Sequence, residues 1–152
     1  RMEIRGIESA FLTSHMSLGN FKPIDVEDLT KHKMDSEEMF ITRENCDIVN
    51  NAKDAGHKIV AVGTTVQRAI ETAADTLGHI NPFEGWTNKF IFPPYKFQVA
   101  DAMFSNFQLP ESTLLMLTAA FGNFDYTMNA YKVALKEDYK FGPFGDVMLI
   151  VD

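Results

Sequence analysis

The sequence predicts an α/β fold in which a mixed sheet is flanked by helices. Its clearest strand is Lys58–Val62 (KIVAV), a run of β-branched and small residues typical of a strand buried on both faces. Gly63 ends this strand, and Val66–Thr76 then continues as a helix that Gly78 closes. A further helical segment precedes the strand. The order helix, strand, tight glycine turn and helix indicates an α/β layer.

The elements before this turn follow from local patterns. Thr42 can cap a helix that runs through Ala55, and Gly56 stands where a C-terminal glycine is expected. The other segments are, in order, a strand at Ser9–Met16, a turn at Leu18–Asn20, a charged and irregular or briefly helical stretch at Asp25–Lys33, and a short strand at Glu38–Ile41.

The second half continues the alternation of strands and helices. Pro110 precedes a helix and Gly122 stops it. The expected segments are an irregular Pro82–Thr87, a strand at Lys89–Phe92, a strand at Gln98–Asn106, helices at Glu111–Phe121 and Asp125–Tyr139, and a strand at Asp146–Val151.

Length and composition favour one body. The chain has 152 residues and 45% hydrophobic content, and no linker or repeat divides it, so residues 1–152 are expected to form a single α/β domain. The first residue is Arg1, which indicates a processed or excerpted chain. No apolar run approaches the roughly 20 residues of a membrane span, and Arg1–Ala10 lacks the apolar core of a secretory signal. We therefore expect a cytoplasmic protein.

The charge and the spacing of cysteine and histidine count against two common classes of function. The one cysteine, Cys46, cannot form an internal disulfide, and the four histidines show no ligand spacing, so no metal site is expected. The net charge of −7 opposes generic nucleic-acid binding, although a locally basic contact remains possible.

The corner after Gly63 is a candidate anion site. The first turn of a helix presents unpaired amides, which Thr64 and Thr65 would carry, and Arg68 follows one turn later as a bidentate donor. The spacing matches neither a dinucleotide nor a Walker loop. The alternative is a capped turn beside a solvated arginine.

Five blocks, taken together, carry a resemblance to a known family. They are similar to the C-terminal part of the S-adenosylmethionine:tRNA ribosyltransferase-isomerases of queuosine biosynthesis, keep that family's order and cover nearly all of the chain. The blocks are Gly19–Glu37, Ile59–Thr72 (IVAVGTTVQRAIET), Phe83–Phe97, Ser105–Phe121 (SNFQLPESTLLMLTAAF) and Tyr126–Ile150.

The resemblance implies a reaction and an architecture. The ribosyl portion of S-adenosylmethionine would be moved to a 7-aminomethyl-7-deazaguanine in the tRNA anticodon, giving epoxyqueuosine and releasing adenine and methionine, without a metal. The chain would be the C-terminal portion of a larger two-domain enzyme, within an incomplete α/β barrel-like domain. The isolated portion would be inactive because the N-terminal region completes the site.

The resemblance also assigns candidate residues. Proton transfer would fall to His15, whose ordinary pKa suits neutral pH, with His32 and Asp35 as further catalytic candidates. A solvated charged face is the alternative for the segment around His32. Candidates for substrate binding, through phosphate, ribose or a base edge, are Lys33, Glu37, Thr64, Thr65, Arg68, Asn106 and Gln108.

Two departures from the family pattern leave other functions open. Gln108 stands where the family has a histidine, and Val66 stands where it has a small polar residue. An amide cannot carry protons as an imidazole does. The alternatives are therefore a divergent relative that acts on another nucleoside or RNA, and a non-catalytic binding fragment.

Overall fold

The computed structural model describes residues 1–21 and 23–151. It confirms the α/β class and the mixed sheet with flanking helices. The helices are α1 (Arg43–Asp54), α2 (Thr64–Ala73), α3 (Thr113–Phe121) and α4 (Phe124–Lys136), with 3-10 turns η1 (Glu3–Arg5), η2 (Leu18–Phe21) and η3 (Leu29–Lys31). The strands are β1 (Thr13–His15), β2 (Glu37–Ile41), β3 (Val60–Val62), β4 (Phe83–Thr87), β5 (Ala102–Asn106) and β6 (Val147–Val151).

The strands form two sheets of three rather than one sheet. The first is wholly antiparallel, in the order β1-β2-β4, with Met39 opposite Ser14 on one side and Gly85 on the other. The second is mixed, in the order β3-β5-β6, because β3 runs parallel to β5 and β6 runs antiparallel to it. The crossover from β3 to β5 contains α2, as parallel pairing requires.

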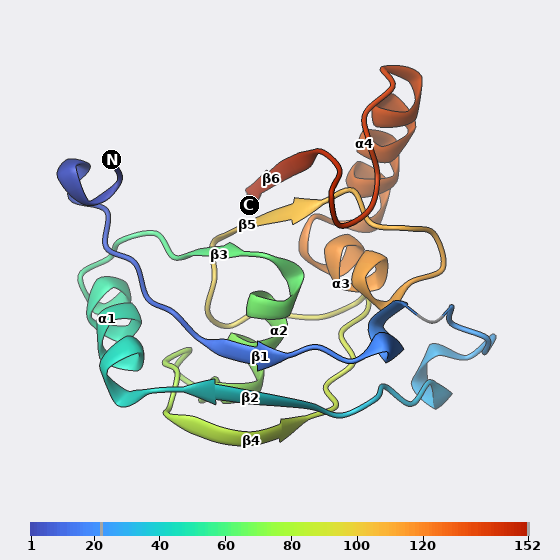
Figure 1. Ribbon diagram of the computed structural model, residues 1–152. Helices are drawn as coiled ribbons and strands as arrows, with labels where there is room; N and C mark the ends of the chain where they lie inside the picture. Colours follow the sequence, from blue (N-terminus) through green and yellow to red (C-terminus); the bar gives the residue numbers. More distant parts are fainter. Residues whose placement is uncertain (22, 152) are drawn as a thin grey trace.

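Helix α2 joins the two sheets. It contacts β3 and β5 of the mixed sheet, β1 and β4 of the antiparallel sheet, and also α3. In Figure 1 it lies between the sheets, while α4 projects from the body beside β5 and β6. Seven of its ten residues are buried, and four of these are polar: Thr64, Gln67, Arg68 and Glu71. Polar groups at this depth require partners, so α2 is where a site is most readily built.

Several local predictions are confirmed. Thr42 caps α1 by accepting a hydrogen bond from the Asn45 amide, and Gly56 follows in the left-handed region at φ 76°. Gly122 ends α3, with its amide donating to the Thr118 carbonyl. Among the described residues, no helix has the length and apolar character needed to cross a membrane.

Other predictions are wrong, for identifiable reasons. The strand around Val60 is not buried on both faces, because α2 covers only one face of the mixed sheet and Val62, on the other face, is 67% exposed. The segment Pro82–Thr87 is not irregular, since Pro82 lies just outside β4 and leaves its ladder intact. The residues Lys89–Phe92 form no strand, and Lys89 reaches the Glu71 carbonyl instead.

The starts of β5 and α3 differ from the predicted ones where side chains form hydrogen bonds with backbone amides or cap the helix. The β5 strand begins at Ala102 rather than at Gln98, because the Gln98 and Val99 amides donate to the Glu71 carboxylate. Helix α3 begins at Thr113, since Ser112 caps it and Glu111 has a left-handed φ of 58° that a helix cannot contain.

Gln67 lacks partners, which predicts a stabilising substitution. Its side chain is fully buried, and neither amide atom has a hydrogen-bond partner among the described residues. We expect Gln67→Met to raise the free energy of unfolding by about 1 kcal/mol, because an unpaired buried amide is replaced by an apolar group. Urea denaturation measures the change. Gln98→Met is the control, because the side-chain amide of Gln98 does have a partner and donates to the Lys96 carbonyl. A loss of stability in Gln67→Met would contradict the prediction.

Tyr131 predicts a dependence of stability on alkaline pH. Burial raises its pKa from 10.0 to about 12, and its hydroxyl accepts a hydrogen bond from the Gln108 amide at 2.7 Å. The folded state therefore holds a proton that the unfolded chain releases. This contribution to stability is complete below pH 10 and is lost as pH rises toward about 12.

Replacing the hydroxyl tests this link. Tyr131→Phe should flatten the fall in stability between these pH values, measured as urea midpoints across the range. Tyr126→Phe, at a residue 78% exposed, is the control and should leave the slope unchanged. Equal slopes for Tyr131→Phe and the parent chain would contradict the assignment.

Candidate functional site

A buried network of Asn20, Glu37 and Arg68 connects three elements that are distant in sequence. The Arg68 guanidinium on α2 forms an ion pair with the Glu37 carboxylate on β2. Asn20, in η2, completes the group: its Nδ2 donates to Glu37 Oε1, and its Oδ1 accepts from Arg68 Nη1 at 2.9 Å. The Ser17 amide also donates to Glu37 Oε1, at 2.8 Å. The network thereby fixes residues 17–20 against β2 and α2.

The charges of this network are almost completely removed from water. Arg68 is 4% exposed and Glu37 is 1% exposed, and this burial lowers the pKa of Arg68 to about 10. Burying two charges is favourable only where each finds a complete set of partners. The Arg68 guanidinium and the Glu37 carboxylate therefore bind each other and Asn20. At 1% exposure, the Glu37 side chain is not accessible to a ligand within this chain.

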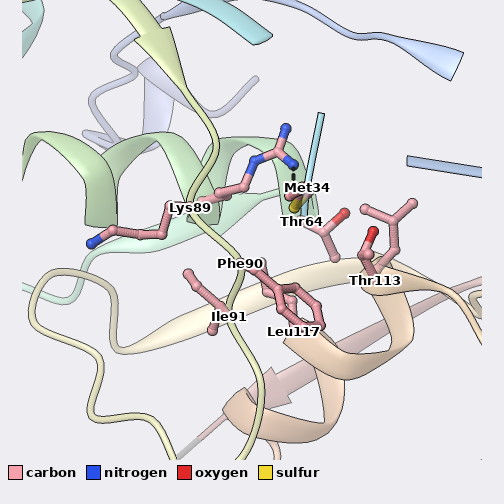
Figure 2. A pocket seen from close by; sticks show the side chains of 9 residues that line it. Met34, Thr64, Lys89, Phe90, Ile91, Thr113 and Leu117 are labelled. Atoms are coloured by element: carbon pink, nitrogen blue, oxygen red, sulfur yellow. Dashed lines mark hydrogen bonds between the residues drawn. The ribbon is translucent and has the colours of Figure 1, made fainter. Parts of the chain in front are cut away.

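A small cavity lies beside the network. Its volume of about 10 Å³ is room for about one water molecule. Figure 2 shows Thr64, Thr113 and Met34 grouped at one part of its wall and Phe90, Ile91 and Leu117 at another. The Thr113 hydroxyl is buried without a hydrogen-bond partner among the described residues, whereas Arg68 Nη1 lies 3.4 Å from Met34 Sδ. The cavity offers an unpaired hydroxyl next to a buried charge.

A larger groove opens on the other side of Asn20. Its volume of about 370 Å³ lies in the range of small-molecule sites. The wall is largely apolar, and its residues are Asn20, Pro23, Gln108, Leu109, Pro110, Ser112, Leu114, Gly142 and Pro143. Asn20 and Leu114 connect the groove with the buried network and the small cavity, respectively.

Gln108 is the polar residue of the groove with hydrogen-bonding capacity to spare. Its Nε2 donates to the Ser105 hydroxyl at 3.2 Å, and its backbone amide donates to Tyr131. Its Oε1 accepts no hydrogen bond from the described residues. By contrast, the Ser112 hydroxyl is engaged by Leu109 and Leu115. A ligand with an amino group at its edge can therefore donate to Gln108 without displacing a contact.

The wall formed by Phe90 and Ile91 is held in place by Glu71 of α2. Its carboxylate accepts hydrogen bonds from the Gln98 and Val99 amides at 2.9 and 3.1 Å and from the Tyr95 hydroxyl at 3.1 Å. Burial, followed by the charge and hydrogen bond of Glu71, raises the pKa of Tyr95 to about 12. Glu71 thus anchors residues 95–99, which follow the residues that line the small cavity.

The structure brings the start of α2 to the end of β1. The Thr65 hydroxyl donates to Met16 Sδ at 3.4 Å, and Met16 is the residue that follows His15 at the end of β1. His15 itself is exposed, with its ring edge toward Phe40 at a centroid distance of 6.0 Å. Among the described residues, no side chain caps α2 at Gly63, and Thr64 faces the small cavity. These residues lie in one region, although their roles remain predictions.

The charged segment after η3 lies along the same region. His32 packs against Phe90 with ring centroids 4.8 Å apart, so it covers the outside of the small cavity's wall. Lys33 and Asp35 are exposed. A Cβ added to Gly19 would overlap the Asp35 side chain, which shows how closely this carboxylate approaches η2.

Asn106 has a local structural task. Its Nδ2 donates to the Gly145 and Asp146 carbonyls at 3.1 and 3.3 Å and so holds the turn before β6. It lines neither the small cavity nor the groove, unlike Gln108 two residues later. Among the described residues, no group of three or more metal-binding side chains gathers anywhere.

Sequence reasoning missed Asn20, Met34, Phe90 and Thr113. Each lies inside a block that resembles the family, but nothing in composition or spacing marks it as part of a site. Asn20 follows a glycine and looks like a turn residue. Its role becomes visible only when η2, β2 and α2 meet.

Comparison with known proteins identifies the family. The family described as "Queuosine biosynthesis protein" matches residues 1–150, and the chain belongs to it. Over the whole chain it is 66% identical to the S-adenosylmethionine:tRNA ribosyltransferase-isomerase of Phocaeicola vulgatus and 64% identical to that of Bacteroides fragilis. It spans 43% of the length of each of these relatives.

A solved structure is similar in fold as well as in sequence. The S-adenosylmethionine tRNA ribosyltransferase from Thermotoga maritima superposes with a TM-score of 0.71 and 44% sequence identity. The similarity covers 76% of this chain and 40% of that one. The chain therefore shares the fold of part of a larger ribosyltransferase.

Proposed function

We propose that these residues are the C-terminal portion of an enzyme that transfers the ribosyl moiety of S-adenosylmethionine to 7-aminomethyl-7-deazaguanine in tRNA, giving epoxyqueuosine. The names of the similar proteins support the reaction. The observation that carries the proposal is the groove beside Asn20, which adjoins the buried network and joins three of the blocks of the resemblance.

The groove is suited to a planar base. Its proline and leucine walls offer flat apolar surface, and Gln108 Oε1 can accept from an exocyclic amino group. Adenine and 7-deazaguanine both carry such a group. We assign Gln108 to recognition of a base edge, and Thr64 and Thr65 to the sugar or to an anionic group at the start of α2.

Proton transfer is assigned to the exposed end of β1 and the segment after η3. The reaction needs a base for the acidic proton beside the sulfonium and an acid for the departing adenine. His15 and His32 have side chains of a suitable type, and Asp35 can stabilise positive charge beside Gly19. We assign Lys33 to a tRNA phosphate, because its cationic side chain is exposed.

Arg68 and Glu37 do not contact the substrate in this scheme. Their charged groups bind each other and Asn20, so they position the groove wall. The reaction takes place in the cytoplasm, where tRNA is available, and the remaining part of the longer protein completes the site. The isolated chain should show no turnover.

The test is release of adenine from S-adenosylmethionine by the longer protein with precursor-bearing tRNA. Gln108→Ala should lower the rate by about 10-fold or more, since one discriminating hydrogen bond is lost. Lys140→Ala, at an exposed lysine whose Nζ pairs with the Asp138 carboxylate, is the matched control. Adenine release no greater than without enzyme would defeat the proposal.

Gln108 also supports a second candidate, a relative that modifies another nucleoside or RNA. An amide recognises a base edge but cannot carry a proton at neutral pH. If the substrate differs, Gln108→His will not increase ribosylation of precursor tRNA, and the parent will show none. A non-catalytic fragment in which the turn at Gly63 serves packing alone is the third candidate: it predicts that calorimetric titration of the longer protein with S-adenosylmethionine gives no heat of binding.

A further inference from the structure

The antiparallel sheet has an outer face that the described residues leave largely uncovered. Its side chains come from every second position of the three strands: Thr13 and His15 on β1, Glu38 and Phe40 on β2, and Glu84 and Trp86 on β4. We call these six residues the outer face. Trp86 is 65% exposed, whereas Met39, on the opposite face, lies in the core with Ile70 of α2. Tryptophan is usually well buried, so packing among the described residues does not account for this ring.

Strand register places an imidazole, a carboxylate and an indole in one row of the outer face. His15 pairs with Glu38, and Glu38 pairs with Trp86. Directly paired residues on one face have Cβ atoms about 5 Å apart, so Glu38 stands between the two rings. The edge of the His15 ring also meets Phe40, at 6.0 Å between centroids, which shows that side chains of this face come into contact. A ligand above Glu38 can therefore reach both His15 and Trp86.

This row has binding capacity that the fold does not use. The Glu38 carboxylate and the Trp86 indole have no side-chain partner among the described residues. A second carboxylate, that of Glu84, stands on the neighbouring row, and the three strands contain no lysine or arginine. The outer face therefore attracts a cation and repels a phosphate.

The kind of cation follows from the proposed function, on which this inference rests. S-adenosylmethionine carries its positive charge on a sulfur that is bonded to three carbon atoms. Because this sulfonium has no N–H group to donate, it is bound through opposite charge and through the face of an aromatic ring, for which an indole is best suited. Glu38 and Trp86 supply the charge and the ring, and His15, assigned above to proton transfer, completes the row.

We infer that Glu38 and Trp86 bind the sulfonium of S-adenosylmethionine and select it over the uncharged thioether S-adenosylhomocysteine. The Glu38 carboxylate compensates the positive charge, and the Trp86 ring packs on the carbon substituents of the sulfur. The acidic proton beside the sulfur then lies on the side of His15. The two residues thereby determine which form of the ligand the site accepts.

Calorimetric titration of the longer protein with each of the two ligands tests the inference without turnover. Glu38→Gln removes the charge, and Trp86→Leu removes the ring. We expect each variant to bind S-adenosylmethionine about fivefold to tenfold more weakly and to bind S-adenosylhomocysteine as the parent does, which also shows that the variant is folded. The matched controls are Glu44→Gln, at an exposed position of α1, and Tyr126→Leu, at a residue 78% exposed, and both should leave the two affinities unchanged.

Equal weakening of both ligands, or no change in either, would overturn the inference, because Glu38 and Trp86 would then not distinguish the charged sulfur. A parent protein that binds the two ligands equally would overturn it as well. A parent that binds neither would overturn it together with the proposed function. If the two variants lose the preference but the parent releases no adenine, the sulfonium site is supported and only the proposed reaction is defeated. If the parent releases adenine and the variants keep the preference, only the sulfonium site is defeated.

Discussion

Arg68→Met should destabilise the protein by about 3–5 kcal/mol, because it leaves the Glu37 carboxylate charged and without its counter-ion in the interior. The ion pair is buried on both sides, at 4% and 1% exposure. Glu37→Gln should cost a similar amount by leaving the guanidinium uncompensated, even though a glutamine oxygen can still accept from Asn20 and Ser17. Urea denaturation of the single variants measures both effects.

The double variant separates pairing from packing. Glu37→Gln with Arg68→Met contains no buried charge, so its loss of stability should be much smaller than the sum of the single losses. Lys58→Ala is the control, because Lys58 forms a comparable pair with Asp101 at 3.1 Å but is 80% exposed, and it should cost less than about 1 kcal/mol. Additive effects in the double variant would show that the charges do not support each other.

Glu71→Ala should also destabilise strongly, by about 3 kcal/mol or more. It removes the acceptor for the Gln98 and Val99 amides and for the Tyr95 hydroxyl, and so leaves one buried and two part-buried donors unpaired. The effect should be greatest in residues 89–99, of which Lys89, Phe90 and Ile91 line the small cavity. Hydrogen exchange across the chain, together with urea denaturation, gives both the size and the place of the loss.

Glu71→Gln is the matched variant for this prediction. Its amide oxygen can still accept from the Gln98 and Val99 amides. Glu71→Gln should therefore lose less stability than Glu71→Ala and retain more protection against hydrogen exchange at residues 89–99. Tyr95→Phe removes a single donor and should cost about 1 kcal/mol. Faster exchange spread evenly over the chain, rather than concentrated in this segment, would contradict the anchoring role of Glu71.

Much of the architecture could be read from local patterns. Thr42, Gly56 and Gly122 mark helix ends through backbone geometry that depends on neighbouring residues only. The turn at Gly63 and the helix after it follow from the same kind of information. The resemblance indicated the family, because five ordered blocks carry more information than any single motif.

The errors occurred where distant groups compete for the backbone. Nothing near Gln98 shows that its amide donates to Glu71, 27 residues away, and so the start of β5 was misplaced. The apolar strand at Val60 looked buried because its composition is that of an internal strand. Its exposed side chains show that one face of the strand has no covering layer among the described residues.

The sequence by itself determined the α/β class, the helix caps and the family, since these depend on short-range periodicity and on ordered motifs. Only the tertiary structure decided that Arg68 is paired with Glu37 and Asn20, that Gln108 faces a groove, and that one face of a sheet lies open. The physical reason is that burial and pairing are properties of side chains brought together from separate elements, and no local pattern records which partners the fold will place within reach.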